Sequence, residues 1–336
     1  MVKLESYHVM IVSKYFDTIE DFINLELVCK QFCGNMEKFH FNPIPLNSKT
    51  VEYFPKIETL HLWDVIDENF GNDFLINKQK IKDIDEFKNV SKKLFYRIIV
   101  WFGVDFETVD KNKTQNIEFK KVTYTQNDRK KFGNKIPSSV TSIGEECFLK
   151  YDRIRRVIIP SNITSIGNRC FRQCNNLSSV IMPSSIKSIG EWCFCFCDSL
   201  SSVTIPSSVT SIGNGCFVLC SSLTSITIPS SVTSIGDQCF RQCTSLSNFT
   251  IPSSVKSTGD CCFNRCSNLS SVIIPLSVIS IGQWCFCGCG NLKSVTIPSS
   301  VTSNCDDIFD SHTVKLKGGI GEIVGNTMNL KTVFCK

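Results

Sequence analysis

A chain of 336 residues is long enough for two ordinary domains, and its apolar content of 42% excludes a mainly disordered protein. The formal net charge of +5 is spread along the chain without a long basic run, which argues against nucleic acid as a partner. The segment Met1–Phe22 mixes apolar and charged residues, and it matches neither a signal peptide nor a transmembrane segment. We therefore expect a soluble cytoplasmic or nuclear protein, with the cell surface as the alternative location.

The first region of the chain, residues 1–46, is predicted to be helical, because apolar residues between Met10 and Phe16 have helical spacing. It continues with the run Asp21–Phe32, which reads Asp-Phe-Ile-Asn-Leu-Glu-Leu-Val-Cys-Lys-Gln-Phe. This run resembles the middle of an F-box, although the usual Leu-Pro opening is Leu4-Glu5 here. The resemblance implies docking to the small adaptor subunit of a cullin-type ubiquitin ligase. The residues that align with the F-box pattern, and that would bind the adaptor, are Leu25, Leu27, Val28 and Phe32.

The second region, residues 47–135, mixes aromatic and charged residues and suits a small folded cap or linker. Ile98–Phe102 is a candidate strand, and Lys78–Lys93 is a charged candidate helix. An uncovered strand edge invites aggregation, so we expect this region to cover the first coil of the repeats that follow.

The third region, residues 136–313, repeats every 23 residues, which predicts a solenoid built from stacked coils. The repeat is marked by one proline per coil: Pro137, Pro160, Pro183, Pro206, Pro229, Pro252, Pro275 and Pro298. In most repeats two small residues follow the proline, and then come apolar residues and a glycine such as Gly167. We expect this glycine to form a turn that needs a positive φ. The alternation at Val203-Thr204-Ile205 predicts a half-buried strand.

Cysteine and phenylalanine recur after each of these glycines, as in Cys170, Phe171 and Cys174. This spacing places the three side chains on one face of a short helical turn. A cysteine at the same point of successive coils forms a ladder of small apolar side chains, so most of the 20 cysteines are predicted to be reduced and structural. The ladder residues are Cys170, Cys193, Cys216, Cys239, Cys262 and Cys285. A metal site in the groups 193–197 and 285–289, or redox-sensitive surface thiols at Cys195 and Cys287, are the alternatives.

The repeat unit Ile-Pro-Ser-Ser-Val-Thr-Ser-Ile-Gly, followed by Cys-Phe and then Leu-Ser-Ser-Val-Thr-Ile, resembles the BspA-type or Treponema-type leucine-rich repeat. This resemblance implies a mainly β solenoid with short helical turns, in a family associated with adhesion, surface recognition and protein binding. The order of an F-box-like segment and such repeats resembles a multigene group in amoebae. The resemblance implies no common enzymatic activity.

Catalysis has no candidate residues in this sequence, because His8, His40, His61 and His312 fall in no nucleophile or metal motif. We therefore predict no enzyme, no cofactor and no metal ion. Trp192 and Trp284 occupy a position that varies between coils, which predicts exposure. They either anchor a ligand or lie flat over their own coil.

The last region, residues 314–336, is predicted to be a C-terminal cap with one or two strands. The preceding unit departs from the repeat, since Ile308 replaces the first cysteine. Two functions remain open at this point. One is a monomeric adaptor that selects targets for a ubiquitin ligase, and the other is a scaffold or cell-surface recognition protein whose amino-terminal helices only cap the solenoid.

Overall fold

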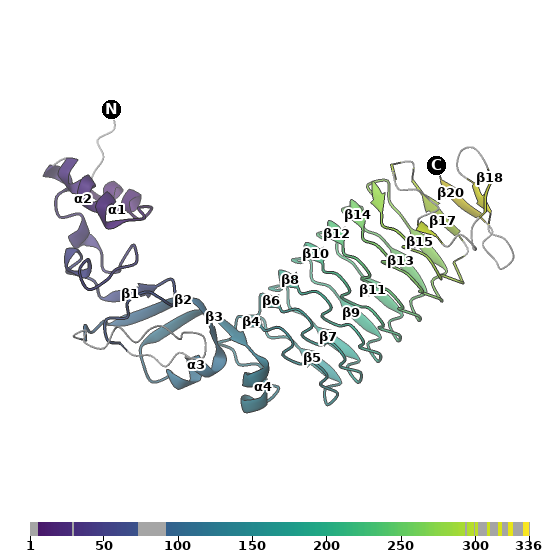
Figure 1. Ribbon diagram of the computed structural model, residues 1–336, viewed down its shortest axis with the longest axis horizontal. Helices are drawn as coiled ribbons and strands as arrows, with labels where there is room; N and C mark the ends of the chain where they lie inside the picture. The colour runs from purple at the N-terminus through teal and green to yellow at the C-terminus, as the bar shows by residue number, and fades with distance from the viewer. Residues whose placement is uncertain are drawn as a thin grey trace. The chain divides into compact units, whose positions relative to one another are not determined.

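The structure is a computed structural model that describes residues 6–28, 30–72, 92–292, 294–298, 300–301 and 308–309, together with three C-terminal strands. The chain divides into two compact units, Met1–Thr123 and Tyr124–Lys336 (Figure 1). Nearly all of the candidate helix Lys78–Lys93 lies outside the described residues, as do Cys29 and His312.

The first unit begins with two helices, α1 (Ser6–Ser13) and α2 (Ile19–Val28), followed by three 3-10 turns. The three turns are η1 (Lys30–Phe32), η2 (Met36–Lys38) and η3 (Val51–Tyr53). The start of α2 is capped, because the Asp21 carboxylate accepts hydrogen bonds from the Thr18 backbone and hydroxyl. Phe22 is fully buried and packs edge to face against Phe39 and Phe54, at centroid distances of 5.8 and 5.3 Å. This aromatic cluster is the core of the helical part.

A parallel sheet completes the first unit, with strands β1 (Thr59–Leu62), β2 (Arg97–Asp105) and β3 (Ile117–Tyr124) in that order. The strand expected at Ile98–Phe102 lies inside β2. A bulge between Val100 and Gly103 shifts the register of β2 against β3. Helix α3 (Phe106–Lys111) follows β2 and connects it to β3.

The second unit starts with helix α4 (Gln126–Phe132), which covers the first coil of the solenoid. A capping box between Thr125 and Asp128 begins this helix. The Arg129 side chain reaches the first coil, where its Nε donates to the Cys147 carbonyl and its guanidinium lies 4.3 Å from the centre of the Tyr151 ring. Helix α4, at the end of the 47–135 region, thus contacts the first coil through Arg129.

Each coil of the solenoid contributes two short strands and a segment of turns, and the strands form two rows (Figure 1). The first row is β4 (Ser142–Ile143), β6 (Ser165–Ile166), β8 (Ser188–Ile189), β10 (Ser211–Ile212), β12 (Ser234–Ile235), β14 (Ser257–Thr258) and β16 (Ser280–Ile281). The second row is β5 (Arg156–Ile158), β7 (Ser179–Ile181), β9 (Ser202–Thr204), β11 (Ser225–Thr227), β13 (Asn248–Thr250), β15 (Ser271–Ile273) and β17 (Ser294–Ile297). Paired strands are parallel and in register with the same position of the next coil, as Ser165 is with Ser188.

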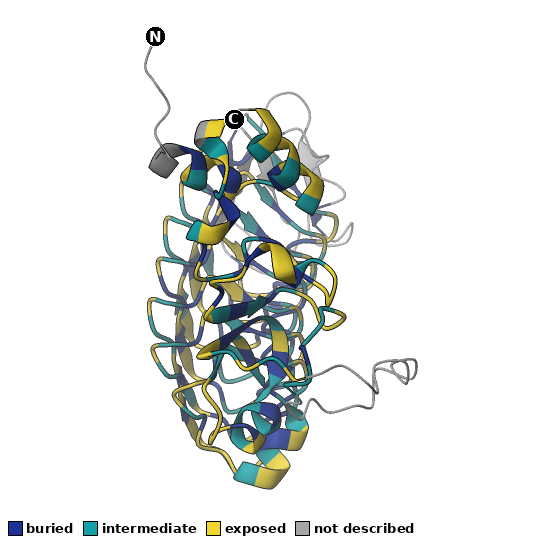
Figure 2. Ribbon diagram, turned by 90° about the vertical axis from the view of Figure 1, so that its left-hand side faces the viewer, coloured by how far each residue is buried: buried dark blue, intermediate teal, exposed yellow. Residues whose placement is uncertain are grey.

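The interior of the solenoid is built from ladders of identical side chains. Val203 is 4% exposed while Ser202 and Thr204 are exposed, so the predicted alternation is confirmed. Figure 2 shows buried and exposed residues interspersed along the coils. Eight phenylalanine rings stack along the axis, with adjacent centroids 5.1 to 5.7 Å apart. They belong to Phe148, Phe171, Phe194, Phe217, Phe240, Phe263, Phe286 and Phe309. Because Ile308 is also fully buried, the last irregular unit still continues the core.

Serine also forms a ladder, and it explains the Pro-Ser-Ser element of the repeat. The hydroxyl of Ser185 donates to the Ile163 carbonyl of the preceding coil, and Ser231 repeats this contact with Val209. The small serine hydroxyl at this place donates a hydrogen bond to a backbone carbonyl of the preceding coil, so that this carbonyl has a partner. The repeat therefore selects serine for a hydrogen bond between coils and not only for its size.

The recurring glycines have a different role from the predicted one. Among the described residues, the glycines with positive φ are Gly34, Gly71, Gly133, Gly215 and Gly288, and the row that contains Gly167 and Gly190 is not among them. A Cβ added to Gly190 would lie 2.5 Å from backbone atoms of Gly167 and Asn168 in the preceding coil. These glycines are needed because adjacent coils approach too closely for any side chain.

The hydrogen-bond ladders are interrupted twice around one coil. In the first row β8 and β10 belong to separate sheets, and in the second row β11 and β13 do. The nearest atom to a Cβ on Gly213 lies at 3.2 Å, against 2.5 Å at Gly190, so the coils are further apart at the first break. At the second break Phe249 replaces the usual Val or Ile and packs against Phe240 and Phe263, at 5.1 and 4.7 Å. The stack of turns, in contrast, is continuous through this coil.

The C-terminal cap has three strands where the sequence predicted one or two: β18 (Lys315–Lys317), β19 (Glu322–Val324) and β20 (Thr332–Cys335). Strand β19 pairs antiparallel with both β18 and β20. This arrangement returns β20 to the solenoid, where it pairs in parallel with β17 at the place of the next coil's strand. The cap thereby covers the edge that the last coil would expose.

Candidate protein-binding surfaces

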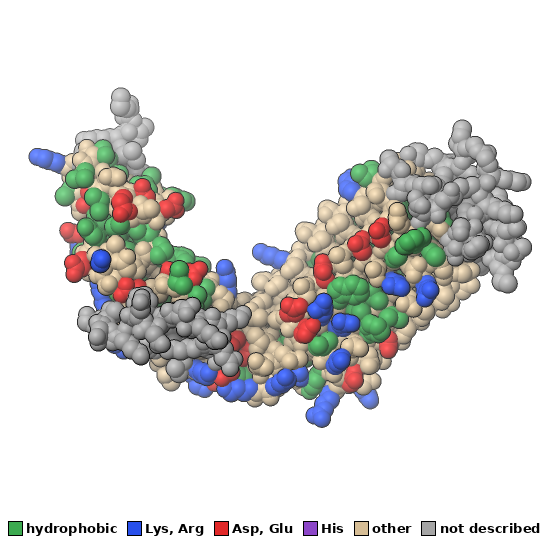
Figure 3. All heavy atoms as spheres, viewed as in Figure 1, with side chains coloured by type: hydrophobic (Ala, Val, Ile, Leu, Met, Phe, Trp, Pro, Cys, Tyr) green, Lys and Arg blue, Asp and Glu red, His purple; other side chains and the backbone are tan. Residues whose placement is uncertain are grey.

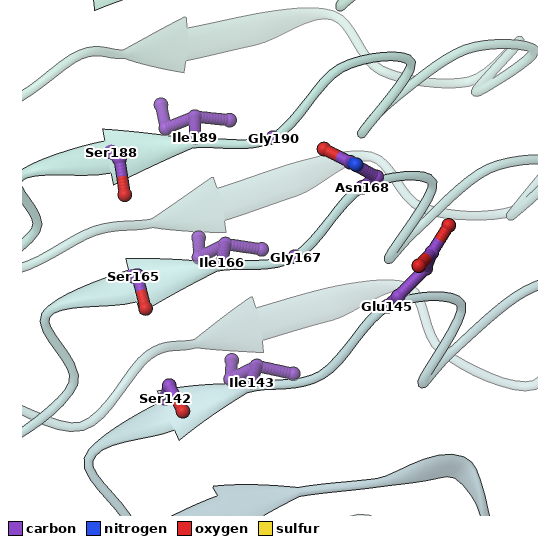
Figure 4. Close-up of a pocket in the computed structure, with 10 residues that line it drawn as sticks. All are labelled: Ser142, Ile143, Glu145, Ser165, Ile166, Gly167, Asn168, Ser188, Ile189 and Gly190. Carbon is purple, nitrogen blue, oxygen red and sulfur yellow. The ribbon is translucent and has the colours of Figure 1, made fainter. Parts of the chain in front are cut away.

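The strand faces of the solenoid carry no arrangement of catalytic residues among the residues described. A shallow hollow of about 480 Å³ lies along the first row of strands, where the isoleucines of three successive coils form a row beside Gly167 and Gly190 (Figure 4). Glu145 is the single titratable residue that lines this hollow. A second hollow, of about 470 Å³, lies at the break between β11 and β13 and is lined by Ser, Thr, Asn, Pro and apolar residues. Over the described part of the chain, no three potential metal ligands lie together.

The side of each coil that lacks strands is a run of turns with an unusual backbone. The short helical turns of the repeat take the form of consecutive i to i−3 hydrogen bonds, such as Leu149 N–H to the Glu146 carbonyl. Two positions per coil, those of Glu146 and Lys150, have positive φ in successive coils. Glycine fills such positions without strain, yet most coils carry large side chains there. We call this side of the solenoid the turn face.

Trp192 lies on the turn face at a φ of 56°, and its indole covers the next coil. A Cβ added to Gly215 would lie 2.4 to 2.6 Å from three atoms of the Trp192 ring, so the ring rests on this glycine. Trp192 is therefore half-buried and does not lie over its own coil. Trp284 occupies the equivalent position and is 56% exposed. The predicted exposure is thus pronounced for Trp284 and partial for Trp192.

The cysteines with described side chains are free, and the six predicted ladder cysteines are fully buried. The second cysteine of each coil also forms a ladder, in which the Cys174 thiol donates to the Phe148 carbonyl at 3.0 Å and the Cys220 thiol to Phe194 at 3.2 Å. The alternative of a surface thiol at Cys195 is wrong, because this side chain is 1% exposed beneath neighbouring turn-face residues. Cys287 is half-buried.

Burial raises the pKa of the ladder thiols, to about 12 at Cys174, and raises that of Cys195 to about 11, with nearby Arg172 acting in the opposite direction. A thiol whose pKa is higher in the folded state stabilises the fold fully below pH 9, and this contribution is lost as the pH rises toward 12. Each such thiol should lower the free energy of unfolding by about 1.4 kcal/mol per pH unit in this window.

Urea unfolding between pH 8 and pH 11 measures this slope, and a Cys174→Val variant is the matched control. Because the variant lacks one buried thiol, its stability should fall less steeply above pH 9. Parallel slopes for both proteins would contradict the raised pKa of Cys174.

Sequence reasoning missed several residues of the turn face. Phe196 and Leu219 occupy the second positive-φ position, at φ values of 60° and 59°, and both are half-buried. Arg172 and Arg241 lie one position earlier in their coils, and the Nε atom of each is buried without an acceptor. The signal was present in the repeat alignment, because this position varies between coils as much as the tryptophan position does.

The four F-box-like residues lie in α2 and η1 of the first unit. Leu27 and Val28 are 78% and 76% exposed at the end of α2, whereas Leu25 and Phe32 are half-buried. Two further large side chains are exposed nearby in the sequence: Val12, at the end of α1, is 52% exposed, and Tyr15, just after α1, is 83% exposed. Large exposed apolar residues on short helices are typical of a docking surface.

The 23-residue coils stack on one another, and the strands of the second row have alternately buried and exposed residues. These features define a leucine-rich-repeat solenoid of about eight turns. The family model described as BspA type leucine-rich repeat region matches in six copies, over residues 128–222 and 193–317. The match covers more than half of the chain, so the chain belongs to this family, as its repeat unit predicted. Leucine-rich repeats of this family are a non-catalytic fold.

Similar solved structures include the leucine-rich repeat protein of T. pallidum, which is 30% identical, with a TM-score of 0.42, over 47% of this chain and 75% of that one. A leucine-rich repeat protein from Bacteroides ovatus is 23% identical, with a TM-score of 0.48, over 77% of this chain and 53% of that one. A leucine rich cell surface protein from Faecalibacterium prausnitzii is 26% identical, with a TM-score of 0.28, over 51% and 74%. Among curated proteins, none matches this chain.

No helix in the described part of the chain is long and apolar enough to cross a membrane.

Proposed function

We propose that this protein is a non-catalytic interaction protein, in which the solenoid binds a target protein and the F-box-like segment docks to the adaptor subunit of a cullin-type ubiquitin ligase. The observation that carries the proposal is the exposure of Leu27 and Val28. Two adjacent apolar side chains that are more than three-quarters exposed have no structural role in their own unit. Their place in the F-box-like run supports an adaptor as the partner.

The thiol ladders support a reducing compartment for this function. The described cysteines are free, and many lie in ladders with another thiol in the next coil. Disulfides are the usual state of paired cysteines in exported proteins, whereas cytosolic thiols stay reduced. A cytoplasmic or nuclear location therefore suits the chemistry of the core.

An affinity pull-down from the protein's own cell lysate tests the proposal, with the intact chain compared with a Leu27→Asp, Val28→Asp variant. We expect the adaptor and the cullin to accompany the intact chain and to be lost with the variant, because two carboxylates at an apolar interface cost several kcal/mol. A double variant at Ile66→Asp and Leu94→Asp is the matched control, since both side chains are over 70% exposed in the same unit. Absence of the adaptor from all three samples would refute the ligase role.

A cell-surface recognition protein is the second candidate, because surface recognition is the other role that BspA-type repeats suggest. Export would expose the sequons at Asn162 and Asn176 to glycosylation. The Nδ2 atoms of these two residues, to which a glycan would be joined, donate hydrogen bonds to the Val140 and Asp152 carbonyls. Glycosylation would disrupt these contacts between coils, so the structure favours the first candidate.

A further inference from the structure

The turn face carries an apolar area between two matching arginines. Phe196 and Leu219 lie in adjacent coils, with the half-buried Trp192 ring beside them on Gly215. Arg172 precedes this area by one coil, and Arg241 follows it by one coil. We call these five residues, Arg172, Trp192, Phe196, Leu219 and Arg241, the turn-face patch. Figure 3 shows hydrophobic side chains gathered between Lys and Arg side chains on one face of the solenoid.

The two arginines lack an ion pair within the described residues, although Arg172 lies beside the Cys195 thiol. Neither Arg172 nor Arg241 has a carboxylate within salt-bridge distance among the described residues, while Arg169 of the same surface is paired with Glu145 and Glu146. Their Nε atoms are buried without an acceptor, so the stems lie against the coils. Nη1 of Arg241 donates to the side-chain Oε1 of Gln238 at 3.1 Å. Arginines placed in this way favour carboxylates on a partner.

The backbone of the patch excludes an extended peptide that adds a strand. The N–H groups of Trp192 and Phe196 donate to the carbonyls of Asn214 and Val218 in the next coil, and that of Leu219 donates to Arg241. No main-chain donor at these positions is left for an added strand, so a partner must bind through side chains. An amphipathic helix binds in this way, because its main-chain groups are paired within the helix and only its side chains reach the partner.

The backbone takes a positive φ at the two positions of the patch's apolar residues in coil after coil, whether the side chain is polar or apolar, so the turn itself does not select an apolar residue. Trp192, Phe196 and Leu219 all have φ values between 56° and 60°. Glycine, as found at Gly215 and Gly288 in the same two positions, adopts this backbone without strain. A large apolar residue there costs about 1 kcal/mol or more, which binding would justify.

We propose that the turn-face patch binds an amphipathic helix of a target protein that carries acidic residues at positions i and i+10 and apolar residues at i+3 and i+7. Three coils separate Arg172 from Arg241, which corresponds to about 15 Å at one strand spacing per coil. Ten residues of an α-helix also span about 15 Å, and positions i, i+3, i+7 and i+10 lie on one face. The inference rests on the proposed function, because it names the surface by which the solenoid selects its target.

A panel of stapled helical peptides with one common polar host sequence tests the proposal by fluorescence anisotropy with the full chain. The first peptide carries Glu at i and i+10 and Leu at i+3 and i+7, the second replaces both Glu by Lys, and the third replaces both Leu by Gln. We expect the first peptide to bind at least tenfold more tightly than the other two. Equal affinity for all three, or no binding of the first peptide at about 100 μM, would overturn the proposal.

Charge reversal on the protein provides the sharper arm of the test. The Arg172→Glu, Arg241→Glu variant should lose the Glu peptide at least tenfold and gain the Lys peptide. A Lys187→Glu, Lys256→Glu variant is the matched control, because these exposed lysines are also three coils apart but precede first-row strands. Phe196→Gln and Leu219→Gln should weaken the binding of both the Glu peptide and the Lys peptide. These variants should keep the coil folded, since Gln173 and Gln242 occupy this position in other coils. Retention of the Glu peptide by the arginine variant would assign binding to another face.

The same variants separate this inference from the proposed function. One outcome of the pull-down is that the Arg172→Glu, Arg241→Glu variant retains both its targets and the adaptor. That result would refute target binding by the turn-face patch and leave the adaptor role intact. Loss of the targets from this variant alone, with the adaptor retained, is the expected result. Absence of the adaptor from the sample with the intact chain would refute the proposed function, while the anisotropy measurement would still test peptide binding by the patch.

Discussion

Replacing Phe217 by alanine is expected to lower the free energy of unfolding by about 3 to 5 kcal/mol. Phe217 is fully buried and stacks between Phe194 and Phe240, with both centroids at 5.5 Å and both rings within 8° of parallel. Its removal takes apolar contacts from two neighbouring coils at once and leaves a cavity in the middle of the stack. Because each coil is stable only through its neighbours, the loss affects the whole solenoid.

Urea-induced unfolding followed by circular dichroism measures this effect. Thr227→Ala is the control, since Thr227 is exposed on β11 and its removal should change the free energy of unfolding by less than about 0.5 kcal/mol. A loss below about 1 kcal/mol at Phe217 would show that the ring stack does not hold the coils together.

The second large effect is expected at the recurring glycines, where Gly282→Ala should cost about 2 to 3 kcal/mol. The new Cβ would lie 2.3 Å from the Gly259 carbonyl carbon and 2.4 Å from the Asp260 nitrogen, so the coils would have to separate. Gly213→Ala is the matched control at the same position of the repeat. Its nearest neighbour would lie at 3.2 Å, in the place where the strand ladder is already interrupted, and the cost should be about 1 kcal/mol or less.

Thermal unfolding of both glycine variants beside the intact chain measures the difference. Equal melting temperatures for Gly282→Ala and Gly213→Ala would contradict the close approach of the coils. A larger loss at Gly213 would also contradict the wider spacing described at the first break.

The repeat made most of the solenoid predictable from sequence. A constant period places Cys239, Phe240 and their equivalents at the same point of every coil, so burial in one coil implies a ladder in all of them. The same reasoning predicted the inward Val203 and the outward Thr204, because strand alternation depends only on neighbouring residues. The family followed from this unit alone.

Features that depend on contacts between coils were not predictable in the same way. The glycine row was interpreted as a turn, since a sequence shows a missing side chain but not the distance to the next backbone. A surface position for Cys195 was an alternative suggested by its alternation with Cys193, whereas a run of turns does not alternate as a strand does. The three strands of the cap arise from antiparallel pairing of segments whose sequences contain no repeat to compare.

The candidate binding surfaces were predicted only in part. The sequence located Trp192 and Trp284 through the variation between coils, and the structure added Gly215 as the support of the first ring. Phe196 and Leu219 were missed, although their position varies between coils in the same way as the tryptophan position. Only their positive φ, which leaves no mark in the sequence, shows that they lie on the turn face. For Leu27 and Val28 the resemblance to an F-box supplied the candidate residues; both are exposed, and their role in docking stays a proposal.

The central claim is that the solenoid contains reduced thiol ladders and acts in a reducing compartment. The most direct test is the redox state of the cysteines in protein isolated from its own cells. Mass spectrometry of the chain, alkylated in denaturant with and without prior reduction, counts the free thiols. The account predicts one and the same mass in both samples, with all 20 cysteines alkylated and no glycan attached. Disulfide-protected cysteines, or a glycan at Asn162, would contradict it and favour a protein of the cell surface.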